Sequence, residues 1–391
     1  MIVRNVVVNN LDDALKLVKN TGCSVRVYDS LAKRGIIESI IIEKLDNRAI
    51  NILKQEVISV GAGAAVNENI VRFKRGLSDV VLFATLNQIE KLIKKISLQP
   101  FGLREVASKL GDVVNKAAKK KFFKYRQKSL NLSNPVVMGI INMDPNSFSG
   151  DGCTDPQKAL RQAVAFEEFG AKIIDIGAES SRPGSRFIDA KTEIKRLIPA
   201  IKKIKKNVSI PISVDTYKYE TAKIALSEGA DIVNDIFALR KGKEKMAKCV
   251  VDAKAGLILM HMKGMPKDMQ ICPKYKNCVS EVYGFLDKQK KYAMSFGVED
   301  DYIAVDPGPG FGKTVEHNVE LIKNMHIFST LGVVVGAVSR KKFVKLVAGD
   351  DKTAFVTANF LTAFCGADII RTHDVKETVN VLKIIEFFRK V

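Results

Sequence analysis

One unit repeats through the C-terminal two thirds of the chain. A short run of Val, Ile, Leu and Ala is followed by a polar or glycine-rich break and then by a longer stretch with helical spacing. Runs that are apolar on both faces predict parallel strands buried between helices, and eight such units predict a closed (β/α)8 barrel, with an open doubly wound sheet as the alternative. The eight runs are residues 136–143, 171–180, 212–216, 230–236, 256–262, 302–308, 333–340 and 367–375.

In the predicted strands, the polar residues gather at the C-terminal ends. Nearly every run begins apolar and ends in a polar or charged side chain, and the C-terminal ends of barrel strands converge on one mouth. Any one of these residues could be a helix cap or a buried hydrogen-bonding group, but their common position favours a single pocket. The residues are Asn142, Asp175, Asp215, Asn234, His261, Asp306, Ser339, Arg340, Lys341, Arg371 and His373.

Composition narrows the class of protein. The 391 residues are 46% hydrophobic and 27% charged, which excludes a disordered chain and a disulfide-stapled miniprotein. The six cysteines form no C-x-x-C pair, so we expect reduced thiols. Without an 18-residue apolar stretch or the features of a signal peptide, we expect a cytoplasmic protein with no membrane partner.

The formal net charge of +20 is concentrated near the N-terminus. Residues 1–134 hold 24 Lys and Arg against 12 Asp and Glu, and six of those cations fall within residues 117–128. We therefore predict a small α/β domain over 1–116, a basic linker or helix over 117–134 and the barrel over 135–391. The linker lacks an aromatic platform, so nucleic acid is not the expected partner, and we expect the first domain to serve packing or oligomerisation.

The segment PGPGFGKT at 307–314 resembles two nucleotide-binding motifs without matching either. Pro307 stands where a phosphate-binding loop needs its first glycine, and the spacing of Gly308, Gly310 and Gly312 does not fit the dinucleotide fingerprint. We expect these glycines to let a loop turn tightly over the mouth and approach a ligand.

Seven ordered segments together resemble dihydropteroate synthase. They cover residues 138–152, 175–185, 213–236, 259–270, 306–318, 339–343 and 371–375, so the resemblance spans the barrel. Residues 1–134 lie outside it, although they are similar to N-terminal extensions of archaeal relatives. The resemblance implies a cytoplasmic, homodimeric transferase that joins 6-hydroxymethyl-7,8-dihydropterin pyrophosphate to p-aminobenzoate in folate biosynthesis. Pyrophosphate would leave in a dissociative, SN1-like step before the C–N bond forms.

The resemblance also implies a division of the site. Asp215, Lys341, Arg371 and His373 would be catalytic, and Asp175 would chiefly restrain the following loop, with direct pterin contact as the alternative. The pterin would bind to Asp215, Asn234, Met260, Asp306 and Lys341. The pyrophosphate would bind to Asn142, Arg182, Arg371 and His373, with Mg²⁺ held through Asn142. The arylamine would bind to Phe148, Ser181, Arg182, Pro183, Phe311, Ser339 and Lys341.

Departures from the family pattern cluster around the predicted amine site. Asp144 and Pro309 replace a usual Thr and Phe, Ser181 replaces a usual Thr, and one additional residue precedes Ser339. An amine carrying a phosphoribosyl group, as in methanopterin synthesis, therefore remains open. Two further alternatives are a pterin-dependent methyltransferase, which generally lacks the Ser-Arg-Lys and Arg-x-His strand ends, and a non-catalytic pterin-binding protein.

Overall fold

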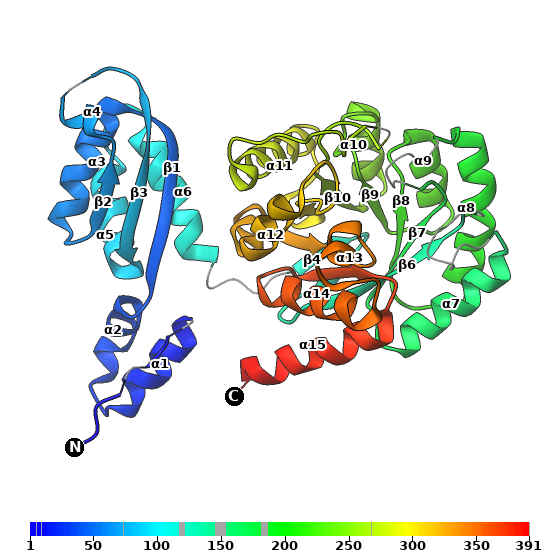
Figure 1. Ribbon diagram of the computed structural model, residues 1–391, viewed down its shortest axis with the longest axis horizontal. Coiled ribbons are helices and arrows are strands. Elements are labelled where there is room, and N and C mark those ends of the chain that lie inside the picture. Colours follow the sequence, from blue (N-terminus) through cyan, green and yellow to red (C-terminus); the bar gives the residue numbers. More distant parts are fainter. Residues whose placement is uncertain are drawn as a thin grey trace. The chain divides into compact units, whose positions relative to one another are not determined.

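The computed structural model describes residues 1–390 apart from 5, 9, 73, 117–121, 145–153, 181–186 and 267. It divides into two compact units, Met1–Lys119 and Lys120–Val391, and each unit has its own hydrophobic core (Figure 1). Within the described ranges, no helix has both the length and the apolar character needed to cross a membrane.

The first unit is the small α/β domain that the sequence predicts. Its antiparallel sheet has the order β1-β3-β2, and β3 buries Val80, Leu82 and Ala84 by strict alternation against α3, α5 and α6. Thr85 and Gln88 form a capping box that begins α5 at the end of β3. The elements are α1 (Leu11–Asn20), η1 (Val25–Val27), α2 (Tyr28–Arg34), β1 (Ile37–Asp46), α3 (Asn47–Ser59), β2 (Gly63–Val66), α4 (Glu68–Val71), β3 (Leu77–Thr85), α5 (Leu86–Ile96) and α6 (Leu103–Lys116).

The second unit confirms the predicted barrel, and each of its eight strands falls within one predicted run. Neighbouring strands pair in parallel and the ring closes between β13 and β6. The strands are β6 (Val136–Asn142), β7 (Ile173–Gly177), β8 (Ile212–Asp215), β9 (Ile232–Asp235), β10 (Gly256–Met260), β11 (Ile303–Asp306), β12 (Val333–Gly336) and β13 (Ile369–Thr372).

Helices surround the strands of this barrel, as Figure 1 shows. Apolar side chains of the helices and of the outer strand faces form one continuous core, which is why the strands read as uninterrupted apolar runs. The helices are α7 (Pro156–Glu168), α8 (Ala190–Lys205), α9 (Tyr219–Ser227), α10 (Lys243–Asp252), α11 (Cys278–Ser295), η2 (Asp300–Tyr302), α12 (Val315–Lys323), η3 (Met325–Leu331), α13 (Lys342–Ala348), α14 (Lys352–Phe364) and α15 (Val375–Lys390).

A hairpin closes the N-terminal end of the barrel. We expected residues 117–134 to form a linker or a helix, but β4 (Phe122–Tyr125) pairs with β5 (Lys128–Asn131). Phe123 is fully buried among the first residues of several barrel strands. Arg126 Nη2 donates to Ala230 O at 2.6 Å. Lys124, Arg126 and Lys128 thus flank apolar side chains that fill one end of the barrel. The predicted site residues stand at the opposite ends of the strands.

Candidate active site

The polar strand ends lie together at the C-terminal end of the barrel. Asp215 and Asp306 are the last residues of β8 and β11, and Asn142 is the last residue of β6. The pairing register places Asn234 beside Asp215 and Met260 beside Asp306. The hairpin fills the opposite end, so the residues predicted for one pocket share one side of the barrel.

Arg371 is held between two carboxylates. Its Nε donates to Asp175 Oδ2 at 2.6 Å, and its Nη2 donates to Asp215 Oδ2 at 2.7 Å. Asn234 Nδ2 donates to Asp175 Oδ2 at 3.2 Å, so Asp175 joins three strands. Asp175 orients the guanidinium that we assigned to the pyrophosphate. The part of the following loop that we expected it to restrain, residues 181–186, lies outside the described residues. Asp175 Oδ1 is buried and has no hydrogen-bond partner in the described part of the chain.

Burial and the neighbouring charges shift the pKa values of Asp215 and Arg371 in opposite directions. Burial raises the pKa of Asp215 to about 7, although the Arg371 guanidinium opposes the rise. Burial lowers the pKa of Arg371, but the carboxylates of Asp175 and Asp215 outweigh it and the net shift is upward. The arginine therefore stays charged, while Asp215 can exchange a proton near neutral pH.

Asp306 and Lys341 form a second charged group at the mouth. Asp306 is buried and its Oδ1 accepts from Gly308 N at 2.7 Å, while burial raises its pKa. Lys341 Nζ donates to Pro309 O and lies 4.5 Å from the centre of the Phe311 ring. Burial lowers the pKa of Lys341 to about 7, and the nearby Asp306 carboxylate limits the fall. The lysine therefore contacts the loop after β11 that carries Phe311.

His373 belongs to a third group of contacts. Its Nδ1 lies 3.2 Å from Ser339 Oγ, and its Nε2 lies 3.4 Å from Asn142 Nδ2. Ser339 Oγ also accepts from the backbone N–H of His373 at 3.2 Å. Arg340 and Asp374 form an ion pair at 2.8 Å beside these residues. Ser339, predicted for the amine, thus contacts His373, which was predicted for the pyrophosphate.

Metal ligands are sparse at this mouth. No group of three or more His, Cys, Asp and Glu side chains within the described residues is arranged to hold a metal ion. The predicted ligand Asn142 offers one amide oxygen, whereas Mg²⁺ in proteins usually takes carboxylates together with substrate phosphates. Within the described residues, the mouth therefore offers Mg²⁺ the Asn142 oxygen and no complete set of protein ligands.

Apolar side chains line one side of the mouth. Met260 packs with Ile236, Phe237, Met262 and Met269, and Phe311 packs against this cluster. The arrangement suits the flat face of a heterocycle, in line with the predicted role of Met260. Four other predicted residues, Phe148, Ser181, Arg182 and Pro183, lie outside the described residues.

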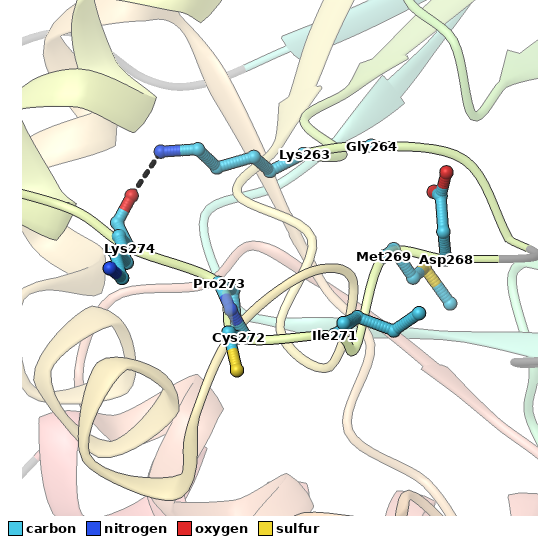
Figure 2. Close-up of a pocket in the computed structure, with 8 residues that line it drawn as sticks. All are labelled: Lys263, Gly264, Asp268, Met269, Ile271, Cys272, Pro273 and Lys274. Carbon is cyan, nitrogen blue, oxygen red and sulfur yellow. Dashed lines mark hydrogen bonds between the residues drawn. The ribbon is translucent and has the colours of Figure 1, made fainter.

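A pocket of about 540 Å³ lies in the segment between β10 and α11. Figure 2 shows its lining, in which Lys263 Nζ donates to Lys274 O. None of the predicted site residues lines it. Lys263 also pairs with Glu281 of α11, and Asp268 accepts from the backbone N–H of Met265. The pocket thus shares no residue with the polar strand ends, and Met269 links its lining to the apolar cluster of the mouth.

A buried ionic network that we did not predict involves the residues that directly follow Asp215 at the end of β8. Lys218 Nζ lies 2.6 Å from Glu179 Oε2 and 3.3 Å from Glu193 Oε1, and Tyr217 donates to Glu179 Oε1 at 2.9 Å. Burial raises the pKa of Glu193, and Thr216 donates to its Oε2 at 2.9 Å. Glu179 and Lys218 follow strands, so the same strand-end signal could have located them.

Known proteins are similar to this chain in sequence and in fold. The family described as pterin binding enzyme matches residues 138–373. A bifunctional dihydropteroate synthase/dihydropteroate reductase of Helicobacter pylori is 33% identical over 99% of this chain and 98% of its own length. A probable bifunctional folylpolyglutamate synthase/dihydropteroate synthase of Halobacterium salinarum is 32% identical over 98% of this chain and 46% of its own length.

Among solved structures, the dihydropteroate synthase of Xanthomonas albilineans with 4-aminobenzoic acid is similar. It has 33% identity and a TM-score of 0.64, and the match covers 70% of this chain and all of that one. Fold, strand-end residues and relatives thus define a pterin-binding barrel enzyme. The chain belongs to the dihydropteroate synthase family.

Proposed function

We propose that this protein condenses 6-hydroxymethyl-7,8-dihydropterin pyrophosphate with p-aminobenzoate and releases pyrophosphate. The observation that carries the proposal is the cluster in which Arg371 bridges Asp175 and Asp215, with Asp306 and Lys341 at the same mouth. A pterin presents amino, ring N–H and oxo groups, and buried carboxylates, an amide and an ammonium are matching partners.

The residues would act chiefly by electrostatics and positioning. The bond between the pterin methylene and the pyrophosphate oxygen breaks, and Asp215 stabilises the positive charge shared by the pterin. The neutral amine then attacks the methylene, and its proton leaves to solvent or to the departing pyrophosphate. Lys341 and Asp306 hold the pterin, while Phe311 and Ser339 frame the amine.

The pyrophosphate would lie against His373 and Asn142, with Arg371 free to turn one of its remaining N–H groups toward it. Magnesium would neutralise charge on the leaving group, bound mainly through pyrophosphate oxygens with Asn142 as its protein ligand. Free thiols at all five described cysteines fit a cytoplasmic enzyme.

The arylamine is tested by comparing two substrates. The experiment measures Mg²⁺-dependent pyrophosphate release from the pterin pyrophosphate with p-aminobenzoate and with its ribofuranosyl phosphate analogue. We expect p-aminobenzoate to give the higher kcat/KM, in keeping with the relative that was solved with 4-aminobenzoic acid. Preference for the analogue would redirect the proposal to methanopterin synthesis, and turnover with neither amine would refute it.

A second activity, reduction of dihydropteroate, is favoured by the match to the Helicobacter pylori relative, because that match includes residues 1–134. The test incubates the full chain with dihydropteroate and a reduced nicotinamide or reduced flavin and follows oxidation of the donor. The barrel alone, residues 122–391, is a matched control, since relatives consist of this unit only. Equal donor oxidation by both proteins would show that the first unit is not needed for the reduction. No donor oxidation by either protein would refute the second activity.

We also propose a homodimer through α14 and α15. These adjacent helices expose Leu361, Phe364, Ile384 and Phe387, and Phe364 is 67% exposed. Exposed apolar patches of this kind on soluble proteins mark association surfaces. Sedimentation should give a dimer for the wild type and a monomer for Phe364→Glu, and a monomeric wild type would contradict the proposal.

A further inference from the structure

Lys313 is a buried lysine that the proposed reaction does not use. Its side chain is 3% exposed and extends from the end of the loop between β11 and α12. Its Nζ donates to Gly308 O at 2.9 Å and to Phe311 O at 3.0 Å, and it lies 2.9 Å from His261 Nδ1. These three contacts match the three hydrogen-bonding positions of a lysine nitrogen.

The His261 ring that contacts Lys313 is uncharged. Burial lowers the pKa of His261 to about 2, with Lys313 adding to the shift, so the ring stays neutral. Its position is set by an edge contact with Phe285 at 4.9 Å between ring centres. Lys313 is therefore anchored to the end of β10 on one side and to its own loop on the other.

The loop that Lys313 holds carries parts of the proposed site. Gly308 N–H donates to Asp306, Pro309 O accepts from Lys341, and the Phe311 ring lies beside the Lys341 ammonium. Gly308 has φ +65°, and a Cβ there would come 2.0 Å from His261 O, so the loop packs directly on the end of β10. A change at Lys313 would thus reach the site through the loop backbone.

We propose that Lys313 is a positioning residue that sets specificity and affinity for the arylamine by holding Phe311 beneath Lys341. The proposal rests on the function proposed above. Side chains hold the loop at several points: Asp306 accepts from Gly308 N, Asn318 accepts from Gly310 N, and Tyr275 donates to Gly312 O. Among these contacts, Lys313 is the side chain that donates to the carbonyl of Phe311 itself. Loss of the Lys313 side chain therefore acts first on the backbone that orients the Phe311 ring, and on the amine more than on the pterin.

The test compares Lys313→Met with Lys248→Met, which removes an exposed lysine that pairs with its helix neighbour Glu244. For Lys313→Met we expect KM for p-aminobenzoate to rise by about tenfold or more, the scale of one lost hydrogen bond from a charged donor. KM for the pterin pyrophosphate should change by less than about twofold. The Lys248 variant should match the wild type in both.

Hydrogen–deuterium exchange of residues 307–313 supplies a readout that needs no turnover. Faster exchange in this loop of Lys313→Met, with unchanged exchange in β10 and β11, is the expected result. Equal rises of both KM values, unchanged KM values, or unchanged exchange in the loop would each overturn the proposal. If the wild type shows no synthase turnover, the proposed function fails, and the exchange comparison still decides whether Lys313 holds the loop.

If Lys313→Met does not accumulate as folded protein, Lys313→Gln replaces it. The shorter amide keeps two N–H donors, so we expect a smaller rise of the p-aminobenzoate KM, still with the pterin KM nearly unchanged. A Gln variant with wild-type kinetics and wild-type exchange in the loop would overturn the proposal.

Discussion

Arg371→Met tests the charge balance of the site. Asp175 is fully buried, and in the described part of the chain its cationic partner is Arg371 at 2.6 Å. Removing one partner of a buried ion pair leaves an uncompensated charge and costs about 3–5 kcal/mol. Arg371 is 20% exposed, so we place the loss in the free energy of unfolding at about 3 kcal/mol at pH 8.

The loss should shrink in acid. Arg371 opposes the rise in the pKa of Asp215, so without the guanidinium this carboxyl keeps its proton to a higher pH in the folded variant. Each pH unit over which the folded variant holds one proton more than the unfolded chain changes the unfolding free energy by about 1.4 kcal/mol, and stability returns as pH falls. Because Asp215 of the wild type also gains a proton in this range, the variant should recover about 1–2 kcal/mol relative to the wild type between pH 8 and pH 6.

Urea denaturation followed by circular dichroism at pH 8 and pH 6 measures both effects. Arg161→Met, at an exposed position on α7, is the matched control and should change stability by less than about 0.5 kcal/mol at either pH. The double variant Asp215→Asn with Arg371→Met should lose the pH dependence. A deficit that is the same at both pH values would refute the assignment of the lost energy to the buried carboxylate.

Three further outcomes are expected. Asp215→Asn and Lys341→Ala should each lower kcat/KM by at least about 100-fold, the scale of one preorganised charged partner, and normal turnover in both would contradict the site. Because burial raises the pKa of Asp215 to about 7 and the reaction needs its carboxylate, kcat/KM should fall as pH drops below about 7; a flat profile from pH 5 to 8 would show that Asp215 stays ionised or is not needed. Gly308→Ala should destabilise the protein by at least about 2 kcal/mol, because its Cβ would meet His261 O at positive φ, whereas Gly284→Ala, with open space around it, should be neutral or stabilising in the same urea assay.

The positions of the barrel strands along the chain could be predicted, because each strand is marked by the residue types of a few consecutive positions. The run at 212–216 contains β8, and the run at 302–308 contains β11, since a strand buried on both faces needs consecutive apolar residues. The polar residues that end these runs, Asp215 and Asp306, stand at the mouth for the same reason. The hairpin at 122–131 could not be read in this way, because its cations dominate the composition and its buried Phe123 gives no periodic signal.

Contacts between side chains of different barrel strands could not be predicted from the sequence. Arg371 contacts Asp175 and Asp215, which lie 196 and 156 residues away along the chain, and Lys313 contacts His261 over 52 residues. Residue type and spacing by themselves determined that polar groups would gather at the C-terminal ends of eight strands. Only the tertiary structure decided which carboxylates share the guanidinium and which lysine stays buried, because strand register and closure of the ring set the distances between side chains from different strands.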